Sequence, residues 1–223
     1  EAIRQLRQDL GRENTLYIHL TLVPFIGTAG ELKTKPTQHS VKTLLEIGMQ
    51  PDILICRTEK RLSREVREKI GLFCNVETDA VIEGRDVETI YEIPLHFAKE
   101  GLDKIVLEKL NIKANKADLR KWTRFVHRVK EPGDRVTIGF VGKYTELKDA
   151  YKSISESFIH AGAENDVVVD IKWIRAEELD GHNVKEILSG IHGLLVAPGF
   201  GIRGIEGKIK AIQYVRENKI PFF

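Results

Sequence analysis

The connection GELKTKPTQHSV, residues 30–41, joins an apolar segment to a helix-like one and carries many hydrogen-bonding side chains. Lys33 and Lys35 would point to the same side of an extended backbone, and each could place an ammonium group on a phosphate oxygen. Gln38 offers a donor and an acceptor, as a nucleobase edge or a ribose requires. Pro36 suits a helix start, where unpaired backbone N–H groups favour an anion. The pattern indicates phosphate binding, and an exposed charged loop before a helix is the alternative.

Four further residues could contribute to such a site. Arg57 ends the next apolar segment, so we expect it at the same edge of a sheet. Lys69 offers another cation and Phe73 an aromatic face for a base, but a surface charge and a core aromatic explain these two residues more simply. His39 is either a donor to a ligand or a packed histidine.

A second candidate site is the glycine-rich turn in LLVAPGFGIRGIEGKI, where an apolar strand runs into Gly199, Phe200 and Gly201. Backbone N–H groups in such a turn can face a ligand, as in the oxyanion holes of acyl-transfer enzymes. Arg203 and Glu206 follow at the expected helix entrance. The alternative is a purely structural turn, because glycine-rich turns are common between strands and helices. No serine or cysteine stands at a strand-to-helix elbow in this window, so it identifies no nucleophile.

Strand-like and helix-like segments alternate around these motifs. Runs of β-branched and apolar residues predict strands at 15–23, 50–57, 135–143, 167–174 and 191–201, the last ending in the glycine-rich turn. Helical patterns with start and stop signals follow at 36–48, 63–73, 149–162, 184–190 and 204–218. Residues 75–112 read as mixed short helices. The alternation predicts an α/β fold of two doubly wound units with mostly parallel sheets.

The two units are separated by a charged stretch in which the strand–helix alternation stops. Residues 113–134 are rich in charge and end on the turn residues EPGD, which predicts an interdomain linker. A solvated helix with a terminal turn is compatible with the same residues. We therefore expect one domain at 1–112 and a second at 135–223.

Composition excludes several classes of protein. The 35 Lys and Arg residues nearly balance the 33 Asp and Glu residues, which argues against a surface dedicated to nucleic acid or membrane. No apolar run approaches the roughly 20 residues of a membrane span, and no secretory leader is recognisable. Cys56 and Cys74 lie in separate apolar stretches and form no CxxC pair, so buried free thiols in a reducing cytoplasm are expected. A start without Met and an end in KIPFF, which reads as a buried strand cut short, favour a fragment.

The stretch GELKTKPTQHSVKTLLEIGMQPDILICR resembles the synthetase domain of the CTP synthase family. LFCNV, GRDVETIYEIP, TIGFVGKYTELKDAYKSI and FGIRGIEGKI…RENKIPFF are similar to the same family in the same order, so the resemblance covers essentially the whole chain. It implies the C-terminal part of a nucleotide-binding amidoligase domain, a linker, and the N-terminal part of a class I glutamine amidotransferase domain.

The resemblance also implies roles for individual residues. The segment that contacts UTP or CTP corresponds to Lys33, Thr34, Lys35, Pro36, Thr37 and Gln38, with Lys69 and Phe73 as further contacts. Positions near the ATP adenine correspond to Arg57, Asp86 and Val87. Gly199 corresponds to a glutamine-binding glycine in the oxyanion turn, together with Phe200 and Gly201. The family pattern is PGGFG, whereas this chain reads APGFG, so Pro198 stands where a glycine N–H is usual.

In activity, the resemblance implies a ligase of pyrimidine biosynthesis that aminates UTP to CTP. ATP phosphorylates the uracil 4-oxygen, and ammonia from L-glutamine displaces that phosphate. Mg²⁺ accompanies ATP on ligands upstream of Glu1, with no metal ligands in this chain. GTP is an allosteric activator and CTP a feedback inhibitor. The implied assembly is a cytoplasmic homotetramer without nucleic-acid or membrane partners.

The same resemblance places the phosphate-binding loop before Glu1 and the glutaminase cysteine after Phe223. We therefore expect no complete catalytic site in these residues, and no activity from them alone. The alternative is a non-catalytic module that binds nucleotides or forms oligomers.

Overall fold

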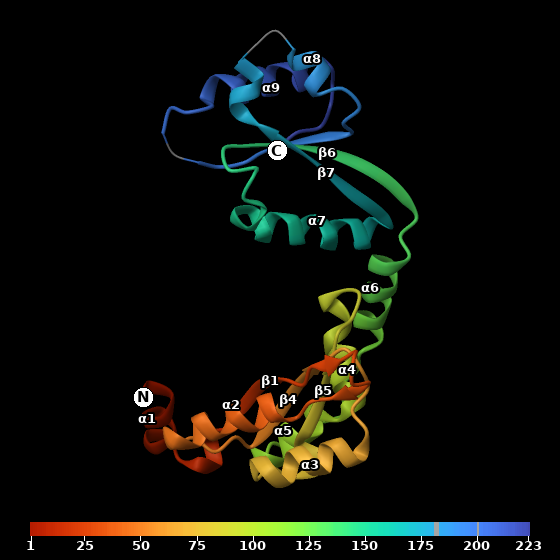
Figure 1. Ribbon diagram of the computed structural model, residues 1–223. Helices are drawn as coiled ribbons and strands as arrows, with labels where there is room; N and C mark the ends of the chain where they lie inside the picture. The colour runs from red at the N-terminus through yellow and green to blue at the C-terminus, as the bar shows by residue number, and fades with distance from the viewer. Residues whose placement is uncertain (181–182, 200) are drawn as a thin grey trace. The chain divides into compact units, whose positions relative to one another are not determined.

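The computed structural model describes residues 1–180, 183–199 and 201–223. The chain divides into two compact units, Glu1–Leu119 and Arg120–Phe223, each with its own parallel sheet (Figure 1). Within the described residues, no helix has the length and apolar character needed to cross a membrane. The predicted α/β class, with mostly parallel sheets, is confirmed.

The sheet of the first unit has three parallel strands in the order β1 (Ile18–Leu22), β4 (Ile53–Thr58) and β5 (Val81–Arg85). The central strand β4 is almost continuously apolar, because helices cover both of its faces. Leu54 and Cys56 point to one face, and Ile53 points to the other. Two layers of helix therefore enclose the sheet, as expected for a doubly wound unit.

The covering helices are α2 (Lys35–Glu46) and α3 (Arg64–Cys74) on one face and α4 (Ile93–Glu100) and α5 (Leu102–Lys109) on the other. The remaining elements of the unit are α1 (Ala2–Leu10), η1 (Arg12–Asn14), β2 (Phe25–Ile26), β3 (Glu31–Leu32), η2 (Thr78–Ala80) and η3 (Ile90–Glu92). Ser63 caps α3 at the start of the predicted helix 63–73, because its hydroxyl accepts a hydrogen bond from the Val66 N–H at 3.3 Å.

Strand β5 corrects the expectation that residues 75–112 contain only short helices. Its apolar run is interrupted by Glu83 and Gly84, and a glutamate normally marks a surface position. In the structure Glu83 is buried, because Arg67 on α3 supplies the opposite charge. The strand signal was therefore hidden by a charged residue whose partner lies 16 positions earlier in the sequence.

Cys56 and Cys74 are free and fully buried, as expected. Burial raises the pKa of each thiol to about 11. Since the thiolate is the reactive species, only about one thiol in a thousand is ionised at pH 8. We predict that a thiol reagent such as DTNB labels the native chain at least 100-fold more slowly than the chain in denaturant, and faster as pH rises. Rapid labelling of both thiols in the native chain at pH 8 would contradict their burial.

The sheet of the second unit has β6 (Asp134–Gly142) at its centre, β7 (Val167–Arg175) on one side and β8 (Gly193–Val196) on the other. The predicted strand in KIPFF also pairs with this sheet, since Phe222 forms a parallel bridge with Leu194. It is not buried, because Phe222 and the terminal Phe223 both remain exposed.

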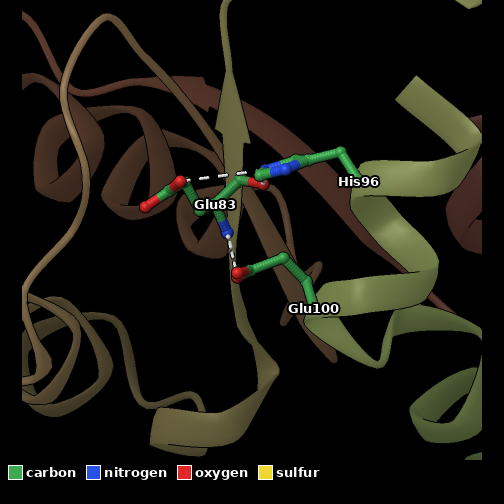
Figure 2. Close-up of side chains that lie close together, drawn as sticks. All are labelled: Glu83, His96 and Glu100. Atoms are coloured by element: carbon green, nitrogen blue, oxygen red, sulfur yellow. Dashed lines mark hydrogen bonds and ion pairs between the residues drawn. The ribbon is translucent and has the colours of Figure 1, made fainter. Parts of the chain in front are cut away.

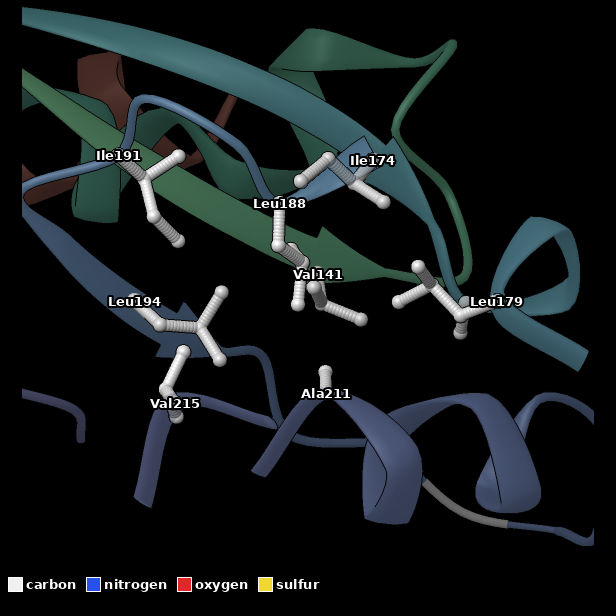
Figure 3. Close-up of a cluster of buried hydrophobic side chains, with 9 residues drawn as sticks. Val141, Ile174, Leu179, Leu188, Ile191, Leu194, Ala211 and Val215 are labelled. Atoms are coloured by element: carbon white, nitrogen blue, oxygen red, sulfur yellow. The ribbon is translucent and has the colours of Figure 1, made fainter. Parts of the chain in front are cut away.

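Helices again lie on both faces of this sheet. The elements are α6 (Arg120–Lys130), η4 (Lys148–Tyr151), α7 (Lys152–Asn165), η5 (Ala176–Asp180), α8 (Val184–Ile187) and α9 (Ile205–Glu217). Val141 packs with Ala211 and Val215 of α9 on one face, in the buried cluster drawn in Figure 3. Phe140, the next residue along β6, packs with Tyr151 and other aromatic residues on the opposite face.

Helix α9 approaches the η5 segment closely enough to exclude a side chain. Gly207, Ala211 and Val215 are buried along one stripe of the helix. A Cβ atom added at Gly207 would lie 1.7 Å from the Ala176 carbonyl oxygen. Backbone therefore meets backbone at this position, which requires glycine.

The predicted linker contains helix α6, so the stretch is not entirely irregular. Val126 of α6 is buried, and the Phe125 ring lies 5.3 Å from the His160 ring of α7. The division between the compact units falls at Leu119 and Arg120, inside the predicted linker. The helix thus belongs to the second unit, and it carries five of the ten charged residues of the stretch.

Candidate functional site

Helix α2 begins at Lys35, one residue before Pro36. Thr34 already has φ −89° and ψ −13°, so the expected extended backbone between the two lysines is wrong. Lys33 still belongs to the connection, where its N–H donates to the Pro24 carbonyl at 2.9 Å. The two lysines therefore reach the helix entrance from different backbone conformations, and both side chains are exposed.

Three polar residues of the connection, Thr34, Thr37 and Gln38, turn inward. Thr37 is fully buried, and its hydroxyl donates to the Leu22 carbonyl and lies 3.0 Å from the hydroxyl of Thr21. The Gln38 amide donates to the Thr34 hydroxyl at 3.1 Å. These contacts fasten the first turn of α2 to the end of β1. Sequence reasoning assigned Gln38 to a ligand and missed this internal bond, which an i, i+4 spacing of two polar residues can signal.

The structure brings the exposed candidate residues together at the entrance of α2. Lys33 pairs with Glu31, and Lys33 first and then the nearby Lys69 hold the pKa of that carboxyl below its ordinary value. The Lys35 ammonium lies 5.6 Å from the centre of the Phe73 ring. Phe73 is 59% exposed, so the alternative of a core aromatic is wrong. Three cations and one aromatic face therefore share a surface next to a helix N-terminus.

Three further candidate residues lie elsewhere or face solvent. His39 is exposed, so the alternative of a packed histidine is wrong. Arg57 and Asp86 lie at the carboxyl ends of β4 and β5, where the Arg57 Nε donates to Asp86 Oδ1 at 2.9 Å. This edge of a parallel sheet is where ligands bind in open α/β folds.

A cavity of about 600 Å³ opens beside this ion pair. Its polar lining includes Arg57, Asp86 and His96. The cavity also includes Val87, and its other walls are largely apolar side chains from Leu20, Ile55, Ile90, Ile93 and Phe97. A flat aromatic base with a charged or polar edge would suit such walls. The predicted grouping of Arg57, Asp86 and Val87 around one space is therefore present in the structure.

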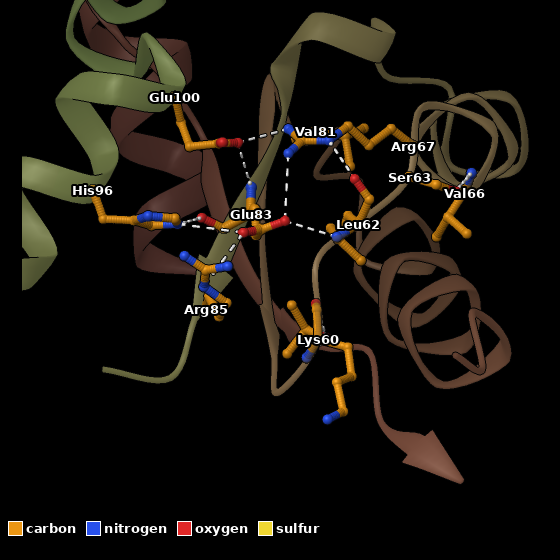
Figure 4. Close-up of polar contacts among 11 residues, drawn as sticks. Lys60, Leu62, Ser63, Val66, Arg67, Val81, Glu83, Arg85, His96 and Glu100 are labelled. Atoms are coloured by element: carbon orange, nitrogen blue, oxygen red, sulfur yellow. Dashed lines mark hydrogen bonds and ion pairs between the residues drawn. The ribbon is translucent and has the colours of Figure 1, made fainter. Parts of the chain in front are cut away.

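A buried charge network adjoins the cavity and was not predicted from the sequence (Figure 4). Arg67 Nη1 donates to Glu100 Oε2 at 2.7 Å, and its Nη2 lies 3.6 Å from Glu83 Oε2. The Leu62 N–H donates to the same Glu83 oxygen at 2.7 Å. Burial acts to raise the pKa of Glu100, but hydrogen bonds from Arg67 and the Glu83 N–H outweigh it and leave that pKa lowered. The network fixes α3 and α4 to β5.

Glu83, His96 and Glu100 also lie close enough to suggest a metal site (Figure 2). The guanidinium of Arg67 already supplies the positive charge to both carboxylates. The His96 Nε2 is 2.9 Å from the Glu83 carbonyl, so it is engaged with the backbone. Mg²⁺ prefers a shell of oxygen ligands. This cluster therefore does not fit Mg²⁺, and we assign it to structure.

In the second unit, two lysines hold the glycine-rich turn from either side. The Lys208 ammonium donates to the Ala197 carbonyl at 2.8 Å, and the Lys143 ammonium donates to the Gly201 carbonyl at 2.9 Å. Burial and then the charge of Lys143 lower the pKa of Lys208. A Cβ atom added at Gly199 would lie 3.7 Å from the Lys143 side chain and 3.8 Å from the Lys208 ammonium, so both lysines are near this glycine. The turn is thus fixed at both ends, and the predicted contribution of Phe200 falls outside the described residues.

Pro198 and Gly199 are both exposed at the tip of this turn. Proline has no N–H, so of these two residues Gly199 alone can donate a backbone hydrogen bond to a ligand. Arg203 pairs with Glu177 at 3.0 Å, and its guanidinium lies 5.3 Å from the centre of the Tyr144 ring. The turn can therefore present the Gly199 N–H to a ligand in a positively charged setting.

Comparisons with known proteins agree with the two-unit division. Residues 1–112 match the family model described as CTP synthase N-terminus. Residues 146–223 match the model described as glutamine amidotransferase class-I. The two matches follow one another in the chain, and each falls on one α/β unit.

Individual relatives cover the whole chain. The CTP synthase of Methanocaldococcus jannaschii is 58% identical over 228 residues, which are 100% of this chain and 42% of that protein. The CTP synthase of Ruminiclostridium cellulolyticum is 56% identical over 223 residues, with the same two coverages. A solved glutaminase domain of Trypanosoma brucei CTPS with bound acivicin is 41% identical, with a TM-score of 0.37 over 40% of this chain and 35% of that one. The chain thus spans about two fifths of the length of these curated relatives.

Proposed function

Because the chain belongs to the CTP synthase family, we propose that it is the part of an ATP-dependent ligase that holds UTP and the ATP base during amination of UTP to CTP. The observation that supports this most directly is the meeting of Lys33, Lys35, Lys69 and Phe73 at the entrance of α2. A nucleoside triphosphate requires cations and unpaired N–H groups for its phosphates and an aromatic face for its base.

In this proposal the first unit binds and orients both nucleotides. Lys33, Lys35 and Lys69 hold the UTP phosphates, while Thr34, Thr37 and Gln38 keep the start of α2 in place. Pro36 lies in the first turn of the helix, and Phe73 faces the pyrimidine nucleotide. Arg57, Asp86 and Val87 surround the adenine in the neighbouring cavity. ATP then phosphorylates the uracil 4-oxygen, ammonia attacks carbon 4, and phosphate leaves. Mg²⁺ bound with ATP would offset phosphate charge during that transfer.

The second unit would take part in releasing ammonia from L-glutamine. The Gly199 N–H would donate to the oxyanion that develops on the glutamine amide, with Lys143 and Lys208 keeping the turn in position. GTP as activator, CTP as feedback inhibitor, a homotetramer and a cytoplasmic location complete the proposal. We expect the isolated 223 residues to form no CTP and to release no ammonia from glutamine. Either activity in the purified chain would contradict that expectation.

The UTP role is tested by Lys33→Ala and Lys35→Ala in a full-length CTP synthase that carries this chain. Each variant loses a charge-assisted contact to phosphate, so we expect UTP binding to weaken by about 1.5–3 kcal/mol, measured by calorimetry. Lys42→Ala is the matched control, because Lys42 is an exposed lysine on the same helix. Unchanged UTP affinity in both test variants would exclude the proposed phosphate contacts.

A further inference from the structure

His96 contributes a hydrogen-bonding group to the cavity beside Arg57 and Asp86. Its Nε2 lies 2.9 Å from the Glu83 carbonyl oxygen, and only an N–H can donate to a carbonyl. In the neutral ring the hydrogen is therefore on Nε2, and Nδ1 is an acceptor. Within the described part of the chain, Nδ1 has no hydrogen-bond partner. Among the described residues, the buried polar atoms without a partner do not include His96 Nδ1. This nitrogen is therefore accessible, and a ligand can reach it.

The ring is held in one orientation by the backbone of β5 (Figure 2). His96 and Glu100 are four residues apart on α4, so they lie on one face of the helix. His96 engages the Glu83 carbonyl, and Glu100 accepts from the Glu83 N–H at 3.2 Å. Arg67 fixes Glu100 in turn, at 2.7 Å. An acceptor held in this way can select between ligands, because the imidazole ring cannot rotate to accommodate a mismatched ligand.

Purine bases differ at carbon 6 in the group that such an acceptor would meet. Adenine carries an amino group, which donates a hydrogen bond, whereas hypoxanthine and guanine carry an oxygen, which accepts one. We propose that His96 is a specificity-determining residue of this cavity, whose Nδ1 accepts a hydrogen bond from the 6-amino group of an adenine nucleotide. A 6-oxo purine would set oxygen against Nδ1, leaving both without a donor. The inference rests on the proposed function, in which ATP occupies this cavity.

Two substitutions distinguish a role of His96 in recognising the base from a role in supporting the fold. In His96→Gln the side-chain amide can replace Nε2–H toward Glu83, but the acceptor at Nδ1 is lost. In His96→Asn the side-chain oxygen can replace Nδ1, but the link to Glu83 is lost. If His96 serves only the fold, His96→Asn should impair the protein more than His96→Gln does. A residue that reads the base would lose selectivity in the glutamine variant alone.

The experiment measures the dissociation constants of ATP and ITP by calorimetry in the full-length protein and both variants. We expect the preference for ATP over ITP to fall about tenfold in His96→Gln, as for one lost hydrogen bond, and to persist in His96→Asn. An unchanged preference in His96→Gln, or no binding of ATP by the parent protein, would overturn the inference. CTP formation by the same preparations tests the proposed function separately. A parent protein that prefers ATP through His96 but makes no CTP would refute the activity and leave this inference standing.

Discussion

Replacing Gly207 with alanine is expected to destabilise the second unit by about 3 kcal/mol or more. Within a helix the same change normally stabilises by up to about 1 kcal/mol. Here the added Cβ would lie 1.7 Å from the Ala176 carbonyl oxygen, so α9 must move away from η5. The separation would also open the cluster around Ala211 and Val215. Steric overlap with backbone therefore outweighs the gain in helix propensity.

The second unit can be followed on its own, since both tryptophans of the chain, Trp122 and Trp173, belong to it. Trp173 packs against Phe140, so its fluorescence should report loss of this core during urea unfolding. Gly199→Ala is the matched control, because a Cβ there would lie 3.7 Å from its nearest neighbour. Equal urea midpoints for the two variants would show that α9 and η5 do not require glycine at position 207.

Replacing Arg67 with methionine is expected to destabilise the first unit by about 3–5 kcal/mol, because it removes the guanidinium that Glu83 and Glu100 share and leaves Glu83 only the 3.8 Å ion pair with Arg85. The side chain of Glu83 is only 4% exposed, so water cannot take the place of the guanidinium. Urea unfolding followed by hydrogen exchange in β4 and β5 would measure the loss in this unit. Arg64→Met is the control on the same helix. Its partner Glu68 is an exposed i, i+4 pair, for which about 0.5 kcal/mol is expected.

Two further observations test the cause of that loss. Glu83→Gln and Glu100→Gln added to Arg67→Met should recover part of the stability, because the unpaired charges are removed. The pKa of Glu100 is lowered in the folded chain, so the ionised form contributes stability above the unfolded pKa of about 4.3. That contribution should disappear as pH falls through the folded pKa, and it should be smaller in Arg67→Met, which keeps the hydrogen bond from the Glu83 N–H but loses the one from Arg67. No recovery and an identical acid response would assign the loss to packing of the Arg67 stem.

Much of the fold was predictable because its strands are dense in apolar and β-branched residues. Strand β5 was not, since Glu83 reads as a surface residue until Arg67 is known to face it. The predicted candidate residues at the α2 entrance do come together, but local conformation was misjudged at Thr34, and the inward turn of Gln38 was missed. These errors have two physical origins. Glu83 is buried because its partner Arg67 lies 16 positions away in the sequence, whereas Thr34 and Gln38 were misjudged because the first turn of α2 forms its own local backbone and side-chain contacts.

The contacts around Glu83 also bear on self-association. Strand β5 is an edge of the described three-stranded sheet, and an edge normally offers unpaired N–H and C=O groups to another chain. Here Arg67 donates to the Val81 carbonyl at 2.9 Å, while Glu100 and His96 engage the N–H and C=O of Glu83. Side chains thus occupy the positions that an incoming strand would use. Besides carrying charge, the network hinders the pairing of another strand at the β5 edge.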